Sequence, residues 1–257
     1  MTGNTEIVDL TVVIPAHNSS SVIEGTTARL AERLAGRSAE IIVVENGSTD
    51  GTFDLCTRLR EQWAQPGVAF EVLRSEKGMG NALRAGAEAS RGAHVLFTAD
   101  DLPFGFDDLD GADRLTADQG STPTVVIGSK AHRESIVQRG ALRGVLTWGF
   151  ATMRRVVLGM RTGDPQGTVL IDGDLVRELA HELVEPGFLF TTELVYVVEG
   201  MGIRPAEVPV RLSADHGSHD TRISRADVVS MGLGLFRLRT RHRAGRGVSS
   251  AATAGRG

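Results

Sequence analysis

The stretch Leu10-Thr11-Val12-Val13-Ile14-Pro15-Ala16-His17-Asn18 is an apolar run that ends abruptly at proline and polar residues. The pattern returns in Glu40-Ile41-Ile42-Val43-Val44-Glu45-Asn46-Gly47-Ser48-Thr49-Asp50-Gly51-Thr52. Uninterrupted apolar runs of this length are typical of parallel strands that are buried on both faces. In open α/β sheets, ligands bind beyond the carboxyl ends of such strands. The residues that follow each run are therefore candidates for a binding site.

Further runs of the same kind predict the fold class. Residues 68–73, 94–97 and 125–128 read as strands, and helical patterns separate the successive runs in the first half of the chain. This β-α-β-α order predicts an α/β fold with a mostly parallel, doubly wound sheet flanked by helices. Residues 203–212 also read as a strand, and Pro205 and Pro209 predict that it lies at an edge.

Composition narrows the class of protein. The chain has 257 residues and a formal net charge of -4, which gives no reason to expect nucleic-acid binding. The single cysteine, Cys56, excludes an internal disulfide and a thiolate metal site, and we expect it to be a buried structural thiol. No run approaches the ~18 apolar residues of a membrane-spanning helix. We therefore expect a cytoplasmic protein, with peripheral contact at the inner membrane face as an open alternative.

The two quoted strands and their loops carry a family resemblance. Val13-Ile14-Pro15-Ala16-His17-Asn18 and Glu45-Asn46-Gly47-Ser48-Thr49-Asp50-Gly51-Thr52 resemble the start of a family 2 glycosyltransferase, which has the nucleotide-sugar-binding GT-A fold. The resemblance extends over residues 11–243 and is closest to the branch that glucosylates or mannosylates dolichyl or other polyprenyl phosphates. It implies a leader of residues 1–9, a GT-A catalytic domain of 10–215, a closing loop and basic amphipathic helix of 216–244, and a disordered tail of 245–257.

Asp100 and Asp101 follow the fourth strand and resemble the aspartate-any-aspartate motif of the family. Ala99 stands where the first aspartate is expected, and Pro103 stands where the polyprenyl-phosphate branch often has a glutamine. The resemblance implies that Asp101 and Asp100 hold Mg2+ or Mn2+, which would stabilise the departing nucleoside diphosphate. The alternative is that both residues only begin a solvated acidic loop.

Several polar and glycine residues are implied to bind the donor. These residues come from five segments of the chain. They are the first loop, the acidic position after the second strand, the Gly-rich segment around residue 80, the cations after the fifth strand and the closing loop. These donor-side residues are Pro15, His17, Asn18, Glu45, Asn46, Gly78, Asn81, Asp100, Lys130, Arg139, Ser218 and Arg222.

Two further segments resemble the acceptor side and an active-site helix. Asp164 and Gln166 lie in Asp164-Pro165-Gln166-Gly167, which resembles an aspartate-threonine-glutamine segment of relatives. Glu193 is the retained glutamate of a Gly-Phe-x-Phe-Asp-x-Glu-Leu pattern, in which Thr191 replaces the aspartate. We expect Glu193 and Asp101 to be the catalytic residues. The alternative for Glu193 is a partner of the helix N-terminal dipole.

The resemblance implies an inverting glycosyltransferase that moves a hexose from a UDP or GDP sugar to a polyprenyl-phosphate-type acceptor. A soluble enzyme that acts on a hydroxyl group of a specialised metabolite is the first alternative. A non-catalytic nucleotide-sugar-binding homologue is the second. A nucleotidyltransferase would need a Gly-rich, arginine-containing loop after the first strand, which Pro15-Ala16-His17-Asn18 does not resemble. The basic final helix either lies on an anionic membrane or packs in the core.

Overall fold

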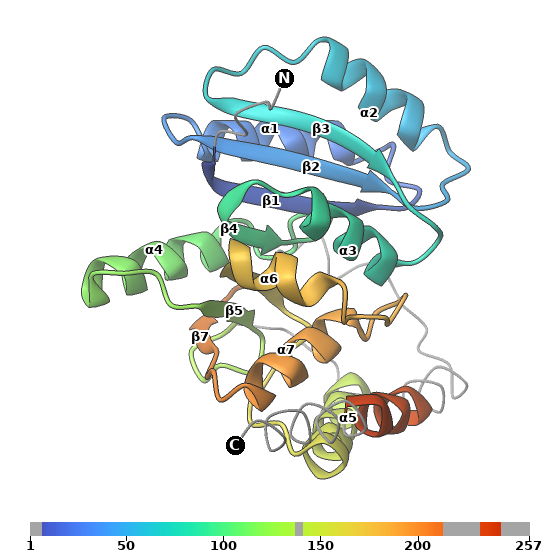
Figure 1. Ribbon diagram of the computed structural model, residues 1–257, viewed down its shortest axis with the longest axis vertical. Helices are drawn as coiled ribbons and strands as arrows, with labels where there is room; N and C mark the ends of the chain where they lie inside the picture. Colours follow the sequence, from blue (N-terminus) through green and yellow to red (C-terminus); the bar gives the residue numbers. More distant parts are fainter. Residues whose placement is uncertain (1–6, 137–140, 213–231, 243–257) are drawn as a thin grey trace, which may run out of the picture.

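A computed structural model describes residues 7–136, 141–212 and 232–242 of the chain (Figure 1). The strands are β1 Val8–Ala16, β2 Ala39–Glu45, β3 Val68–Arg74, β4 Gly92–Phe97, β5 Val125–Ser129, β6 Thr168–Asp172 and β7 Ala206–Pro209. The helices are α1 Ile23–Arg33, α2 Thr52–Glu61, α3 Met79–Ala89, α4 Asp107–Gln119, α5 Ala141–Leu158, α6 Gly173–Ala180 and α7 Phe190–Gly200. One more described helix spans residues 232–242.

The strands form one seven-stranded sheet in the order β3-β2-β1-β4-β6-β5-β7. β1, β2, β3 and β4 are parallel, β6 is antiparallel to both β4 and β5, and β7 is parallel to β5. The predicted mostly parallel sheet is therefore confirmed. In the described part of the chain β7 pairs only with β5, which agrees with the edge position predicted from its prolines.

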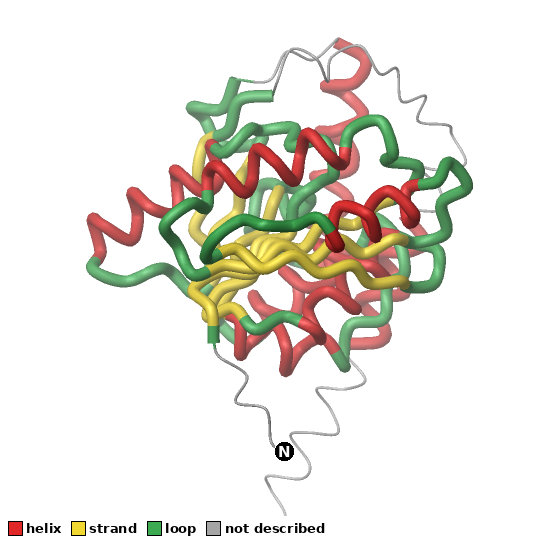
Figure 2. Tube along the Cα trace, turned by 90° about the horizontal axis from the view of Figure 1, so that it is seen from above, coloured by secondary structure: helices red, strands yellow, loops and turns green. Residues whose placement is uncertain are grey.

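Helices cover both faces of the sheet, as a doubly wound fold requires (Figure 2). Successive side chains of a strand point to opposite faces. Val13 of β1 accordingly joins one hydrophobic cluster with α3, α6 and α7, whereas Val12 and Ile14 join a second cluster with α1, α2 and α4. Cys56 of α2 is fully buried in the second cluster, and burial raises the pKa of its thiol to about 11, which agrees with a structural role.

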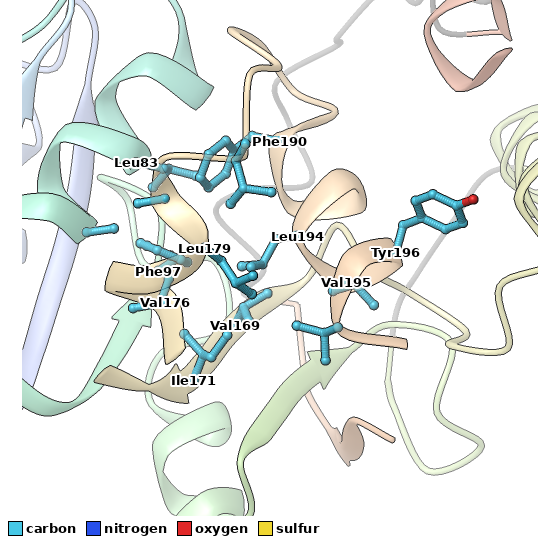
Figure 3. Packing of buried hydrophobic residues seen from close by; sticks show 14 of the residues in the cluster. Leu83, Phe97, Val169, Ile171, Val176, Leu179, Phe190, Leu194, Val195 and Tyr196 are labelled. Atoms are coloured by element: carbon cyan, nitrogen blue, oxygen red, sulfur yellow. The ribbon is translucent and has the colours of Figure 1, made fainter. Parts of the chain in front are cut away.

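The first cluster links the end of β4 to the start of α7 (Figure 3). Phe97 is the last residue of β4 and Phe190 is the first residue of α7. Their rings meet edge to face with centroids 6.1 Å apart, a favourable geometry for aromatic pairs. This contact fixes α7, which carries Glu193, relative to the strand that leads to Asp100 and Asp101.

The domain boundaries inferred from the sequence need one correction. β1 begins at Val8, so the division after residue 9 falls inside the strand, because Val8 already pairs with Gly92 of β4. The predicted sites Arg139, Ser218 and Arg222, most of the expected closing loop and the expected tail lie outside the described residues. None of the described helices is both long and apolar enough to cross a membrane.

Candidate functional site

The carboxyl ends of β1, β2 and β4 meet at one edge of the sheet. Ala16 at the end of β1 lies opposite Glu45 at the end of β2, and Val13 of β1 lies opposite Phe97 at the end of β4. The loops that start at these positions hold most of the described donor-side candidates. The edge is therefore the candidate site, as expected for an open parallel sheet.

Hydroxyl groups from the first loop and α1 hold the turn that contains Asp100. Ser19 Oγ donates to Asp100 Oδ2, and Thr26 Oγ1 donates to the Asp100 carbonyl oxygen at 2.6 Å. The Ser19 N–H in turn donates to Thr52 Oγ1 at 2.8 Å. Ser19 and Thr26 were not predicted from the sequence. The only available signal was the hydroxyl residue directly after Asn18.

The carboxylate oxygens at the end of β4 fit a divalent cation that a substrate also binds. Asp100 and Asp101 are both partly exposed and offer hard carboxylate oxygens. Mg2+ is commonly held by one or two carboxylates together with substrate phosphates. In the ranges that the structure describes, no group of three or more histidine, cysteine, aspartate or glutamate side chains forms a protein-only metal site. The metal role of Asp100 and Asp101 stays a prediction.

Asn18 joins the first loop to the second. Its φ of +55° is a left-handed conformation that asparagine tolerates better than most residues. The Asn18 N–H donates to Ser48 Oγ at 3.0 Å, and Asn18 Oδ1 accepts from the Thr49 N–H at 2.9 Å. Pro15 is half-buried at the end of β1, and His17 is exposed beside it.

Glu45 and Asn46 connect the second loop to its neighbours. Glu45 Oε1 accepts the Ser48 N–H, and Oε2 lies 3.2 Å from Arg74 Nε. Although burial alone would raise the pKa of the Glu45 carboxyl, these contacts hold it below its usual value. Asn46 Nδ2 donates to the Ala16 carbonyl at 3.0 Å, and Asn46 Oδ1 accepts the Gly78 N–H at 3.3 Å. The predicted residues are brought together, but their contact with a nucleotide stays a prediction.

The start of α3 is hydrogen-bonded to the loop before α7. The N–H groups of Gly80 and Asn81 donate to the Pro186 carbonyl oxygen at 2.9 Å and 3.3 Å. We expected Gly78 and Asn81 to face the donor. Their backbone N–H groups and that of Gly80 already have protein acceptors, and contact of Gly78 and Asn81 with the donor stays a prediction. The helix start therefore does not offer these amides to a phosphate.

Lys130, Asp164 and Gln166 form a second cluster, although the resemblance implied that Lys130 lies on the donor side and Asp164 and Gln166 on the acceptor side. Lys130 Nζ lies 3.2 Å from Asp164 Oδ2 and 3.4 Å from the Gln166 carbonyl oxygen. The Lys130 ammonium also lies 5.2 Å from the centre of the Phe104 ring. Phe104 closely follows Asp101 in the chain, so the cluster adjoins the segment that begins with the two aspartates.

Three residues that the sequence analysis did not assign hold this cluster in place. Arg154 is only 5% exposed and donates to the carbonyls of residues 162 and 163 at 3.1 Å and 2.6 Å. Glu199 accepts the Thr162 N–H at 2.7 Å, and Glu207 accepts the Gly163 N–H at 2.8 Å. Burial lowers the pKa of the Arg154 guanidinium, while the nearby carboxylates oppose that shift. Arg154 and Glu199 gave no signal in the sequence, because Arg154 bonds to backbone carbonyls, which no side-chain pattern marks, and Glu199 bonds to a segment 37 positions away.

Glu193 of α7 is fully buried. Its carboxylate accepts the N–H groups of Val184 and Glu185 and contacts His242 and Arg241 of helix 232–242. Its predicted catalytic role stays a prediction, and the contacts described for it are with the protein.

A family match agrees with this fold, and it includes the loops that follow β1, β2 and β4. Residues 11–111 match the family described as glycosyl transferase family 2. The predicted class is confirmed: the protein is a glycosyltransferase of the GT-A fold.

Relatives and solved structures cover most of the chain. A dolichyl-phosphate beta-glucosyltransferase of Drosophila melanogaster is 28% identical over 250 residues, which cover 92% of this chain and 76% of that protein. The Saccharomyces cerevisiae protein of the same name is 28% identical over 233 residues, 83% of this chain and 69% of that protein. Glucosyl-3-phosphoglycerate synthase from Mycobacterium tuberculosis, solved with UDP, has a TM-score of 0.61 and 21% identity, covering 91% of this chain and 80% of that one.

Replacing Gly78 with alanine tests the close contact at the start of α3. Gly78 has a φ of +132°, and a Cβ atom there would lie 2.2 Å from the Pro186 carbonyl oxygen. We expect Gly78→Ala to lower the free energy of unfolding by about 1–3 kcal/mol, measured by denaturant titration. Gly25→Ala is the matched control, because a Cβ atom at this exposed position in α1 meets nothing within 4 Å. It should raise stability by about 0.5–1 kcal/mol. Equal effects of the two changes would contradict the contact.

Proposed function

We propose that this glycosyltransferase moves a hexose from a UDP-sugar to a polyprenyl-phosphate acceptor, with inversion at the anomeric carbon. The observation that carries the proposal is the match over 92% of the chain to a relative named dolichyl-phosphate beta-glucosyltransferase. The arrangement of the site supports it. Asp100 and Asp101 begin the segment that contains Phe104, and the Phe104 ring lies beside the Lys130 ammonium.

On the donor side, Asp101 and Asp100 would hold Mg2+ or Mn2+. Bound there, the cation would offset the negative charge that develops on the departing nucleoside diphosphate. The chain orients Asp100 by two hydrogen bonds: Ser19 Oγ donates to its carboxylate, and Thr26 Oγ1 donates to its backbone carbonyl oxygen. A glucosyl-3-phosphoglycerate synthase structure with Mn2+ and UDP supports a divalent cation by analogy of fold.

On the acceptor side, Lys130 would attract the phosphate of the acceptor. Asp164 orients Lys130 through both its ammonium and its backbone N–H, the latter at 3.0 Å from Asp164 Oδ2. A phosphate oxygen is already anionic, so its attack on the anomeric carbon needs no general base. A hydroxyl acceptor would need one, and Glu193, the buried carboxylate expected to be catalytic, is engaged with the protein. This difference favours a phosphate acceptor over the hydroxyl group of a metabolite.

Exposed apolar side chains, one on a residue next to the acceptor cluster and two on helix 232–242, suit a lipid. The Phe188 side chain is 73% exposed, and its carbonyl oxygen lies 3.5 Å from Gln166 Nε2. Leu233 and Phe236 of helix 232–242 are each more than half exposed. Leu235 and Leu238 of the same helix are buried, so the helix packs on the protein with one face and leaves another free for a membrane surface. Peripheral contact at the cytoplasmic face of a membrane is part of the proposal.

The donor side can be tested by thermal unfolding with UDP or GDP, each with and without Mn2+. Ligands that bind the native state raise the melting temperature by mass action. We expect UDP with Mn2+, at about a hundredfold excess over Kd, to raise Tm by roughly 5 °C or more. Asp101→Asn should remove the effect of Mn2+, whereas Asp118→Asn, at an exposed position near the end of α4, should not. A rise in melting temperature with GDP and none with UDP would overturn the choice of a UDP-sugar as the donor. No shift with either nucleotide would favour a homologue that has lost donor binding.

The acceptor side can be tested with polyprenyl phosphate, the corresponding polyprenol and labelled UDP-glucose. We expect Lys130→Ala to raise the KM for polyprenyl phosphate roughly 10-fold or more, because a charge-assisted contact to phosphate is lost. Lys130→Arg should keep most of the affinity, because arginine keeps the positive charge and also binds phosphate. Transfer to the polyprenol or to a soluble hydroxyl compound, with none to the phosphate, would instead support the metabolite alternative.

A further inference from the structure

The buried carboxylate of Glu193 joins two separate segments. Its Oε2 atom accepts the N–H groups of Val184 and Glu185 at 2.9 Å and 2.8 Å. Its Oε1 atom lies 2.9 Å from His242 Nε2 and 3.5 Å from Arg241 Nη1. Each carboxylate oxygen therefore faces a different part of the chain: Oε2 faces the loop before α7, and Oε1 faces helix 232–242.

These contacts compensate the cost of burying a charge. A carboxylate with no exposed surface is unfavourable unless it is hydrogen-bonded and paired. Burial alone would raise the pKa of Glu193, but the hydrogen bonds with His242 and the two backbone N–H groups hold it below its usual value. Tyr196, one turn along α7, meets the His242 ring edge to face with centroids 6.0 Å apart. His242 is thus held by two residues of one helix.

The loop that Glu193 holds is the loop that packs on α3. Residues 184 and 185 donate to Glu193, and the next residue, Pro186, accepts the N–H groups of Gly80 and Asn81. The packing is close, because a Cβ atom at Gly80 would lie 2.1 Å from the Glu185 carbonyl oxygen. A shift of this loop would therefore move the start of α3.

The start of α3 is bonded in turn to the donor edge. The Gly78 N–H donates to Asn46 Oδ1, and Asn46 Nδ2 donates to the Ala16 carbonyl at the end of β1. A continuous set of contacts thus runs from His242 through Glu193, the loop of residues 184–186 and the start of α3 to Asn46. It ends beside the loops that we assign to the nucleotide.

We propose that Glu193 is a positioning residue, and that it does not act as a general base. It couples helix 232–242 to the start of α3 and so to the loops on the donor side of the site. The effect on donor affinity rests on the proposed function, whereas the coupling between the two segments does not.

Two substitutions separate positioning from base catalysis. Glu193→Gln keeps one oxygen for the backbone N–H groups and gives an amide that can hydrogen-bond to His242, but it cannot take up a proton. His242→Ala leaves the carboxylate and removes its 2.9 Å contact with helix 232–242, so that the 3.5 Å contact with Arg241 is what remains of the two. Glu182→Gln and His181→Ala are matched controls, because both residues are exposed and lie just before the same loop.

The first readout is hydrogen exchange of the full-length protein over residues 77–83, which needs no substrate. We expect His242→Ala to speed exchange there at least threefold, and Glu193→Gln and both controls to stay within a factor of two of wild type. Unchanged exchange in His242→Ala would overturn the coupling.

The second readout is steady-state transfer from UDP-glucose. We expect Glu193→Gln to keep kcat within about threefold of wild type, since a lost general base costs roughly 100-fold or more. His242→Ala should raise the KM for UDP-glucose at least threefold with kcat within a factor of two. A 100-fold loss of kcat in Glu193→Gln, with KM unchanged and a normal melting temperature, would establish Glu193 as the base. If wild type neither binds UDP nor transfers glucose, the proposed function fails, and hydrogen exchange alone decides the coupling.

Discussion

The parallel register of β2, β1 and β4 is the constraint on which the site depends. Ala16 opposite Glu45 and Val13 opposite Phe97 bring three loops to one edge of the sheet. The register is strongly specified, because alternate residues of β1 pack into two different hydrophobic clusters on opposite faces. A slip by one residue would exchange the two sets of side chains. The order of apolar residues in the strands thus determines where the polar residues of the loops meet.

The polar residues at this edge orient one another before any substrate is considered. Ser19 holds Asp100, Asn46 holds Gly78, and Asp164 holds Lys130. Preorganised groups of this kind are effective in catalysis, because little reorganisation is needed when charge develops. The same principle accounts for Glu193. Its full burial and its contacts with two segments suit a residue that fixes geometry more than one that exchanges protons with a substrate.

Much of the fold could be predicted because its determinants are local. Continuous apolar runs identified the parallel strands, and the prolines of residues 203–212 identified the edge strand. Lys130, Asp164 and Gln166 were each singled out because they lie in short segments that resemble the family, but Lys130 was assigned to the donor side and its contact with Asp164 and Gln166 was not predicted. The bond between Pro186 and the start of α3 could not be predicted, since it joins residues more than a hundred positions apart. Two further contacts had no local pattern that marks them: His242, 49 positions away, holds the Glu193 carboxylate, and Arg154 bonds to the backbone carbonyls before Asp164.

A crystal structure with UDP and Mn2+ would test the central claim most directly, which is that the donor binds at the carboxyl edge of β1, β2 and β4. The measurement is the position of the anomalous scattering peak of Mn2+. We predict one peak at coordination distance, about 2.0–2.3 Å, from a carboxylate oxygen of Asp101, with the diphosphate as a shared ligand. Bound UDP at another edge of the sheet, or a peak away from Asp100 and Asp101, would contradict this account.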